Sequence, residues 1–121
     1  MLSDLCDGST AEESACALAD ANTAEAAMRK SYGRAIAAAK AMLDSEMIDP
    51  STSVHHDFRG DIREDQRRWL SWVEHECRLE GNFTMGSAGS VVEPKCKGRL
   101  AIERTKMLDD LAAQLEGLVP H

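Results

Sequence analysis

Four cysteines constrain the fold of this 121-residue chain more than any other feature of its sequence. Each lies near the end of a helical pattern, at Cys6, Cys16, Cys77 and Cys96. An even number of cysteines in a short chain, placed in this way, is typical of disulfide staples rather than of a reactive thiol. Because disulfides persist in oxidising compartments, we expect a periplasmic or secreted protein. The sequence leaves all three connectivities of two disulfides open.

Helical periodicity predicts an all-α fold in a single domain over residues 1–121. Three helices are expected, one long and two shorter, over residues 11–47, 57–79 and 94–115. Ser9 and Thr10 are candidate N-caps of the first helix, with Glu12 placed as in a capping box. Pro50 disfavours the helical conformation of the residue before it and so ends this helix. Pro94 suits the first turn of the third helix.

The three helices are expected to pack antiparallel, in an up-down-up arrangement that brings the cysteines together at one pole. Aromatic residues make up only 4% of the chain, while alanine and methionine are plentiful. We therefore expect closely spaced helices that meet through small side chains. Tyr32, Trp69 and Trp72 are predicted to belong to the core. Trp69 and Trp72 share a helical face, and their alternative role is an exposed aromatic anchor for a partner.

Residues 81–92 are predicted to form a loop, because they contain three glycines and little charge. A loop held by flanking disulfides suits recognition, since the constraint lowers the ordering cost of binding. Phe83 and Met85 would offer apolar contacts, and Ser87 and Ser90 would offer hydrogen bonds. The alternative is a plain connection between the second and third helices.

The chain carries 14 basic and 21 acidic residues, a formal net charge of −7. This balance argues against binding to nucleic acid or to anionic membranes. It favours a cationic partner, although solubility alone also accounts for it. No apolar run approaches the roughly 20 residues of a membrane-spanning helix. No apolar leader follows Met1 either, so we expect the leader of an exported protein to be missing and Met1 to be an expression start.

The sequence shows no set of residues suited to catalysis, to metal binding or to a cofactor. His75, Cys77 and Cys96, with His55 and His56, lack the ligand spacing of zinc sites. A cysteine nucleophile would need a free thiolate beside a base, and His75 and Cys77 do not share a helical face. We cannot identify in the sequence a nucleophile, a general base and an oxyanion site that would act together. We therefore do not expect an enzyme.

The order and spacing of these residues resemble the bacterial LprI-type lysozyme-inhibitor domain family over residues 6–112. The matching positions are the four cysteines, the Gly86–Ser90 loop and five further residues: Tyr32, Gln66, Trp69, Trp72 and Arg104. Two positions depart from the family pattern. Met28-Arg29 replaces a leucine-asparagine pair, and Val73-Glu74 replaces an arginine-aspartate pair. A buried polar network built on those positions would therefore be absent or rebuilt in this chain.

The resemblance implies a small exported helical protein that inhibits lysozyme. Lysozymes are typically basic, so the negative net charge would speed association and make it sensitive to salt. The expected contact is the 81–92 loop, with Ser87 and Ser90 hydrogen-bonded to catalytic carboxylates and acidic residues steering the encounter. The alternative is a cell-envelope structural or interaction module that docks through the acidic face of residues 57–79 without inhibiting anything. Salt-sensitive binding to lysozyme separates these two functions.

Overall fold

The computed structural model describes residues 8–48, 56–84 and 86–119, with the backbone alone for residues 46–48 and 87. These residues form three long helices and one short 3-10 helix: α1 (Thr10–Ile48), α2 (Arg59–Phe83), η2 (Gly86–Ala88) and α3 (Gly89–Gly117). They contain no strand, so the predicted all-α class with three helices is confirmed. No helix in the described ranges is long and apolar enough to cross a membrane.

α1 and α3 form the most closely packed pair of helices. The buried stripe of α1 consists mainly of small residues: Cys16, Ala17, Ala21, Ala24, Met28, Ser31, Ala35, Ala38, Ala39 and Met42. Alanine favours the helical conformation and leaves room for a neighbouring backbone. On α3, a Cβ added to Gly98 would lie 3.4 Å from the Cα atom of Ala21. The expectation of closely spaced helices that meet through small side chains is therefore confirmed.

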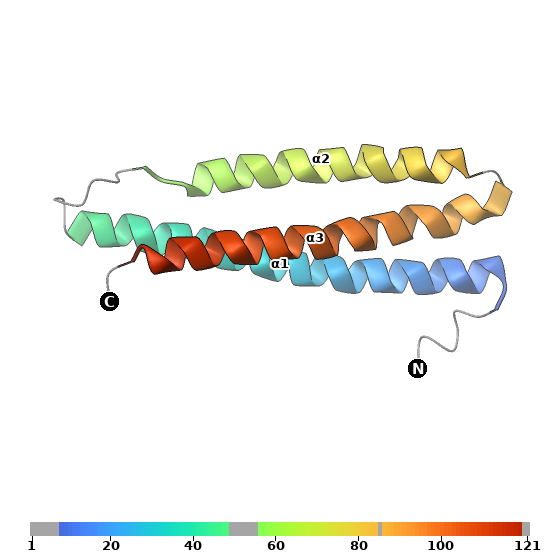
Figure 1. The fold of residues 1–121 in the computed structure, drawn as a ribbon, viewed down its shortest axis with the longest axis horizontal. Coiled ribbons are helices and arrows are strands. Elements are labelled where there is room, and N and C mark those ends of the chain that lie inside the picture. Colours follow the sequence, from blue (N-terminus) through green and yellow to red (C-terminus); the bar gives the residue numbers. More distant parts are fainter. Residues whose placement is uncertain (1–7, 49–55, 85, 120–121) are drawn as a thin grey trace.

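Contacts between the helices show the direction in which each one runs. Ser14 near the start of α1 contacts Ser90 at the start of α3, and Arg34 further along α1 pairs with Glu116 near the end of α3. α1 and α3 therefore run in the same direction. α2 returns in the opposite direction, because a disulfide joins its last third to the first third of α3. Figure 1 shows this course from α1 through α2 to α3.

One disulfide lies within the described residues, between Cys77 and Cys96, whose Cα atoms are 5.4 Å apart. Both cysteines are almost fully buried between α2 and α3. Cys16 is buried near the start of α1, and no described cysteine is free. Cys6 lies outside the described residues, so a second disulfide stays a prediction.

The predicted loop over residues 81–92 is wrong in its extent. α2 continues to Phe83 and α3 begins at Gly89, so that only residues 84–88 connect the two helices. The glycines serve a close approach of the helix ends, since a Cβ added to Gly89 would lie 2.8 Å from the carbonyl oxygen of Gly81. The same residues that indicate a long loop in the sequence therefore form a tight turn.

The predicted start of the third helix at Pro94 is also wrong, because Pro94 lies in the second turn of α3. Proline has no backbone N–H, so the carbonyl oxygen four residues earlier, on Ser90, lacks its helical donor. The hydroxyl of Ser14 on α1 donates to that oxygen at 2.9 Å. A side chain from a neighbouring helix thus replaces the hydrogen bond that Pro94 removes.

Trp72 lies outside the core, contrary to the prediction, with 49% of its surface exposed. α2 buries a narrow stripe, made up of Ile62, Gln66, Val73, Cys77 and Gly81. Successive helical residues point about 100° apart, so Trp72 faces outward when Val73 faces inward. Trp69, at the edge of the stripe, and Tyr32 on α1 are partly buried and pack against the core. Leu79, also on α2, is 49% exposed as well.

Gly89→Ala should destabilise the fold by about 1–3 kcal/mol, because the added methyl group would overlap the backbone of Gly81. Gly33→Ala is the matched control, since Gly33 is exposed inside α1 and nothing lies within 4 Å of an added Cβ. We expect this control to gain about 0.5–1 kcal/mol, the usual difference between glycine and alanine inside a helix. Urea unfolding of both variants measures the two effects. Stabilisation by both substitutions would contradict the close approach of Gly81 and Gly89.

Candidate partner-binding pole

The turn between α2 and α3 lies beside the start of α1. The hydrogen bond from Ser14 to Ser90 joins α1 and α3 near their starts, at the end of the molecule where α2 stops (Figure 1). We call this end the tip pole, and define it as residues 81–90 together with the first turn of α1, Thr10–Glu13. It contains the described part of the segment that the sequence indicates for partner binding.

The turn at the tip pole is closed by short-range hydrogen bonds. The backbone N–H of Thr84 donates to the carbonyl oxygen of Gly81 at 3.2 Å. The Thr84 hydroxyl donates to the backbone carbonyl oxygen of Glu80 at 3.3 Å. Gly86 adopts φ 79°, a left-handed conformation that glycine enters without steric cost. These features allow five residues to reverse the chain direction.

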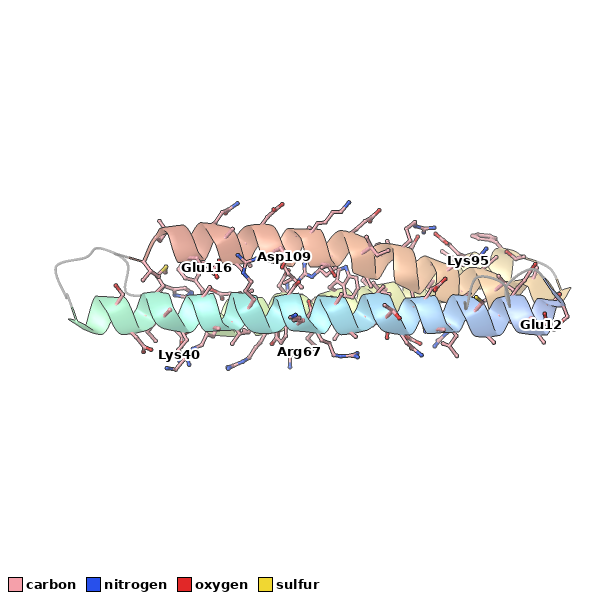
Figure 2. All side chains as sticks on the ribbon, turned by 90° about the horizontal axis from the view of Figure 1, so that it is seen from below. Glu12, Lys40, Arg67, Lys95, Asp109 and Glu116 are labelled. Atoms are coloured by element: carbon pink, nitrogen blue, oxygen red, sulfur yellow. A yellow bond between two sulfur atoms is a disulfide. The ribbon has the colours of Figure 1, made fainter. Side chains whose placement is uncertain are left out.

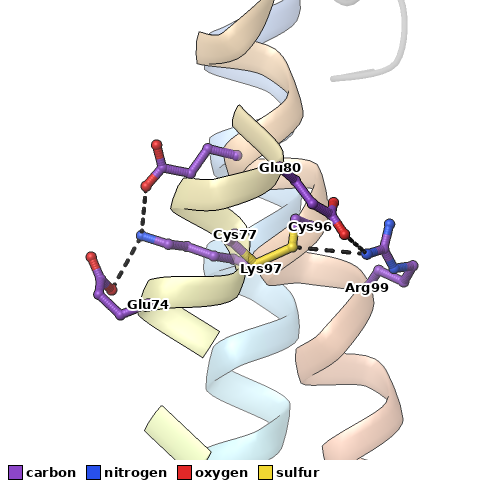
Figure 3. Close-up of a disulfide and its surroundings, with 7 residues drawn as sticks. Glu74, Cys77, Glu80, Cys96, Lys97 and Arg99 are labelled. Carbon is purple, nitrogen blue, oxygen red and sulfur yellow. Dashed lines mark hydrogen bonds and ion pairs between the residues drawn. A yellow bond between two sulfur atoms is a disulfide. The ribbon is translucent and has the colours of Figure 1, made fainter. Parts of the chain in front are cut away.

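A disulfide and ion pairs hold α2 and α3 together directly below the turn (Figure 3). The ammonium group of Lys97 lies 3.4 Å from Glu74 on α2 and 3.6 Å from Glu93 on α3. Arg99 pairs with Glu80 at 2.9 Å. Exposed ion pairs contribute at most about 1 kcal/mol each, so the covalent bridge is the main constraint. The turn is therefore presented on a cross-linked helix pair.

The residues predicted for partner binding are described only in part. Phe83 is the last residue of α2, and 78% of its surface is exposed. Ser90 is exposed in the first turn of α3. Met85 and the side chain of Ser87 lie outside the described residues. The structure thus places Phe83 and Ser90 at the same end, while a role in binding stays a prediction for all four.

The tip pole also carries unpaired negative charge, which the sequence analysis did not locate. Glu12 and Glu13 are exposed in the first turn of α1, and Figure 2 shows Glu12 at that end of the helix. No basic residue occurs in α1 before Arg29. Among the described residues, Glu12, Glu13 and Asp20 form no ion pair. Carboxylates at a helix N-terminus are favoured by its dipole, which explains their presence without a cation.

Two carboxylates at the opposite end of the molecule, Asp57 and Glu116, are paired with arginines. Hydrogen bonds from Arg59 lower the pKa of Asp57 to about 2. A hydrogen bond from Arg34 likewise lowers the pKa of Glu116 below its usual value. The charges of these two carboxylates are neutralised by their arginines, whereas Glu12 and Glu13 at the tip pole form no ion pair among the described residues.

A buried arginine fixes α3 against α2 in the middle of the molecule. Arg104 is only 5% exposed, and its Nε atom donates to Oε1 of Gln66 at 3.0 Å. Its Nη2 atom donates to Asp65 at 2.7 Å, and its Cζ atom lies 5.8 Å from the centre of the Trp69 ring. Buried charges need such partners. Sequence reasoning identified Gln66, Trp69 and Arg104 as a matching pattern, but not as one connected network.

The described residues contain no group of three His, Cys, Asp or Glu side chains that could hold a metal ion. Comparison with protein families gives a match to the family described as Lysozyme inhibitor LprI, over residues 6–108. The matched range includes all four cysteines, the turn at the tip pole and the Arg104 network. Comparisons with curated proteins and with solved structures gave no match.

Proposed function

The chain belongs to the LprI family of lysozyme inhibitors, and we propose on this basis that it inhibits a lysozyme by binding it through the tip pole. Three features that occur together at the tip pole support the choice of this surface. Carboxylates of α1 that form no ion pair lie at the same end of the molecule as the exposed side chain of Phe83, and a disulfide holds the two helices that the turn connects. Each of these features favours binding to a cationic enzyme.

Charge provides the long-range part of the proposed interaction. Opposite charges on two proteins raise the rate of diffusional encounter and orient the partners. The chain has a formal net charge of −7, and Glu12 and Glu13 at the tip pole have no cation beside them in the described structure. A basic lysozyme would therefore approach this pole in preference to the opposite one.

The tip pole would provide the short-range contacts. Aromatic side chains are enriched among the residues that dominate binding energy at interfaces, and Phe83 is the most exposed of the large apolar side chains in the described residues. Met85 would extend this apolar contact, and Ser87 and Ser90 would donate hydrogen bonds to the catalytic carboxylates of the enzyme. Because the turn is short and cross-linked, little conformational entropy is lost on binding.

We also propose that the protein is exported, to the periplasm or beyond the cell. Disulfides such as Cys77–Cys96 persist in oxidising compartments. In such a compartment we also expect a disulfide between Cys6 and Cys16, because these are the two cysteines that do not take part in the Cys77–Cys96 bridge. An exported inhibitor would meet lysozyme in the compartment where that enzyme attacks the cell wall.

Inhibition of a cationic lysozyme should be stoichiometric at low salt and several-fold weaker at physiological salt. Raising the ionic strength from about 0.01 M to about 0.15 M shortens the screening length from about 30 Å to about 8 Å, which removes most of the steering. The measurement is the lysis of peptidoglycan-containing cells by lysozyme, titrated with the oxidised protein. Equal potency at both ionic strengths would contradict electrostatic steering. No inhibition of any lysozyme class would contradict the function itself and favour the alternative of a cell-envelope interaction module.

A further inference from the structure

A groove separates α1 from α2 in the middle of the molecule, away from the tip pole. Both helices pack on α3 but hardly touch one another, and the space between them has a volume of about 530 Å³. Pockets of about 300–1,000 Å³ are typical of small-molecule sites. The walls include Met28 and Tyr32 from α1, and Trp69 and Val73 from α2, while Gln66 also lines the groove.

Gln66 provides the clearest sign that this groove takes a ligand. The side chain is only 6% exposed, and its amide faces the guanidinium group of Arg104 at 3.0 Å. Arginine has donors only, so the amide atom that faces Arg104 must be the oxygen. The Nε2 group, with two N–H donors, then makes no hydrogen bond to any described residue. Buried donors without an acceptor are unfavourable, and a ligand in the groove would supply one.

The aromatic side chains indicate what else the ligand must present. Tyr32 and Trp69 come from opposite walls and are both partly buried, so each has ring surface directed to the rest of the core. The remaining ring surface in the groove suits the apolar face of another ring. The guanidinium group of Arg104 already lies over the Trp69 ring. A cationic ligand at this ring would therefore be repelled by a buried positive charge.

Charged side chains at the rim balance one another. Glu25 and Arg29 border the groove on the α1 side, and Glu74 and Lys97 border it on the other. Glu74 and Lys97 form an ion pair at 3.4 Å. A rim with two charges of each sign has no net preference for an anion or a cation, and it offers both donors and acceptors. This pattern favours a neutral ligand that carries several hydroxyl groups.

We propose that the groove binds a neutral saccharide that carries an acetamido group. The carbonyl oxygen of the acetamide accepts a hydrogen bond from Nε2 of Gln66, and its methyl group lies among Met28 and Val73. The sugar ring packs against Tyr32 and Trp69, and its hydroxyl groups reach the charged rim. This site is separate from the tip pole and does not depend on the inhibition of lysozyme.

Tryptophan fluorescence tests the proposal in the absence of lysozyme. The chain has two tryptophans, so Trp72→Phe leaves Trp69 in the groove as the sole reporter. The probes are the tetramer of N-acetylglucosamine and cellotetraose, which has the same linked rings without acetamido groups. We expect the fluorescence of Trp69 to change saturably with the N-acetylglucosamine tetramer at millimolar concentrations, and not to change with cellotetraose. No change with either probe, or equal affinity for both, would overturn the proposal.

Gln66→Glu identifies the hydrogen-bond donor, because it keeps an acceptor for Arg104 while removing both N–H groups. We expect this variant and Tyr32→Leu each to bind the N-acetylated tetramer about tenfold more weakly. Ile102→Ala is the control, since Ile102 is exposed on α3 and lines a different groove. Circular dichroism establishes that each variant is folded. Unchanged affinity in both folded groove variants would show that the saccharide binds elsewhere and contradict the assignment.

Discussion

Arg104→Ala should lower the free energy of unfolding by about 3 kcal/mol, because it removes a large buried side chain and leaves a buried acceptor unpaired. The guanidinium group is bound to Gln66 and Asp65 and lies over Trp69, so its loss removes contacts to three residues of α2. Arg104→Lys should recover only part of the loss, since an ammonium group cannot reproduce the planar fork of donors.

Arg34→Ala is the matched control for this arginine. Arg34 also joins two helices, through Glu116 at 2.5 Å and Asp109 at 3.7 Å, but its side chain is 45% exposed. Exposed ion pairs of this kind contribute at most about 1 kcal/mol. Urea unfolding of the two variants under the same conditions compares the sites. Equal losses would show that burial of Arg104 contributes little, and would contradict the network described here.

Replacing Cys77 and Cys96 together by alanine should cost about 3 kcal/mol, the value expected for a disulfide that closes a loop of this length. The two cysteines are 19 residues apart in sequence. Because α2 contacts α1 only sparsely, the end of α2 depends on its attachment to α3. Hydrogen exchange should therefore increase most over the last two turns of α2 and the turn at the tip pole. Unchanged stability and exchange would contradict the role assigned to the bridge.

Reduction of the same double variant tests the remaining pair of cysteines. Only Cys6 and Cys16 are then left to form a disulfide. A further loss of stability on addition of a reductant is expected, because a bridge between them would fasten the chain before α1 to its first turns. Stability that is indifferent to the reductant would contradict the predicted second disulfide.

The start of α1 could be predicted from the sequence because local chemistry determines it, whereas Pro50, expected to end this helix, lies outside the described residues. The Ser9 hydroxyl accepts a hydrogen bond from the N–H of Glu12 at 3.3 Å, as the capping pattern indicates. The segment around Gly81 and Gly89 could not be interpreted in the same way. Glycine is equally suited to a flexible loop and to a close approach of two backbones, and only the packing of α2 on α3 decides between them. For this reason the sequence predicts a loop over residues 81–92, whereas only residues 84–88 connect α2 to α3.

Features that depend on contacts between distant residues were not predictable from local pattern. Nothing in the sequence near Pro94 indicates that Ser14 will donate to the carbonyl oxygen of Ser90, whose helical donor the proline removes. The exposure of Trp72 follows from how narrow the contact of α2 with α3 is, which periodicity alone does not reveal. Resemblance to a family identified Gln66 and Arg104 as matching positions, whereas the hydrogen bond between them is visible only in three dimensions.

The most direct test of binding through the tip pole is the inhibition constant of two charge variants against a cationic lysozyme at low salt. Glu12→Gln with Glu13→Gln changes the tip pole, while Glu103→Gln with Asp110→Asn changes the net charge equally elsewhere on exposed carboxylates without ion pairs in the described structure. We expect about tenfold weaker inhibition for the tip variant and less than about twofold for the control. Equal effects of the two variants would contradict a lysozyme-binding site at this pole.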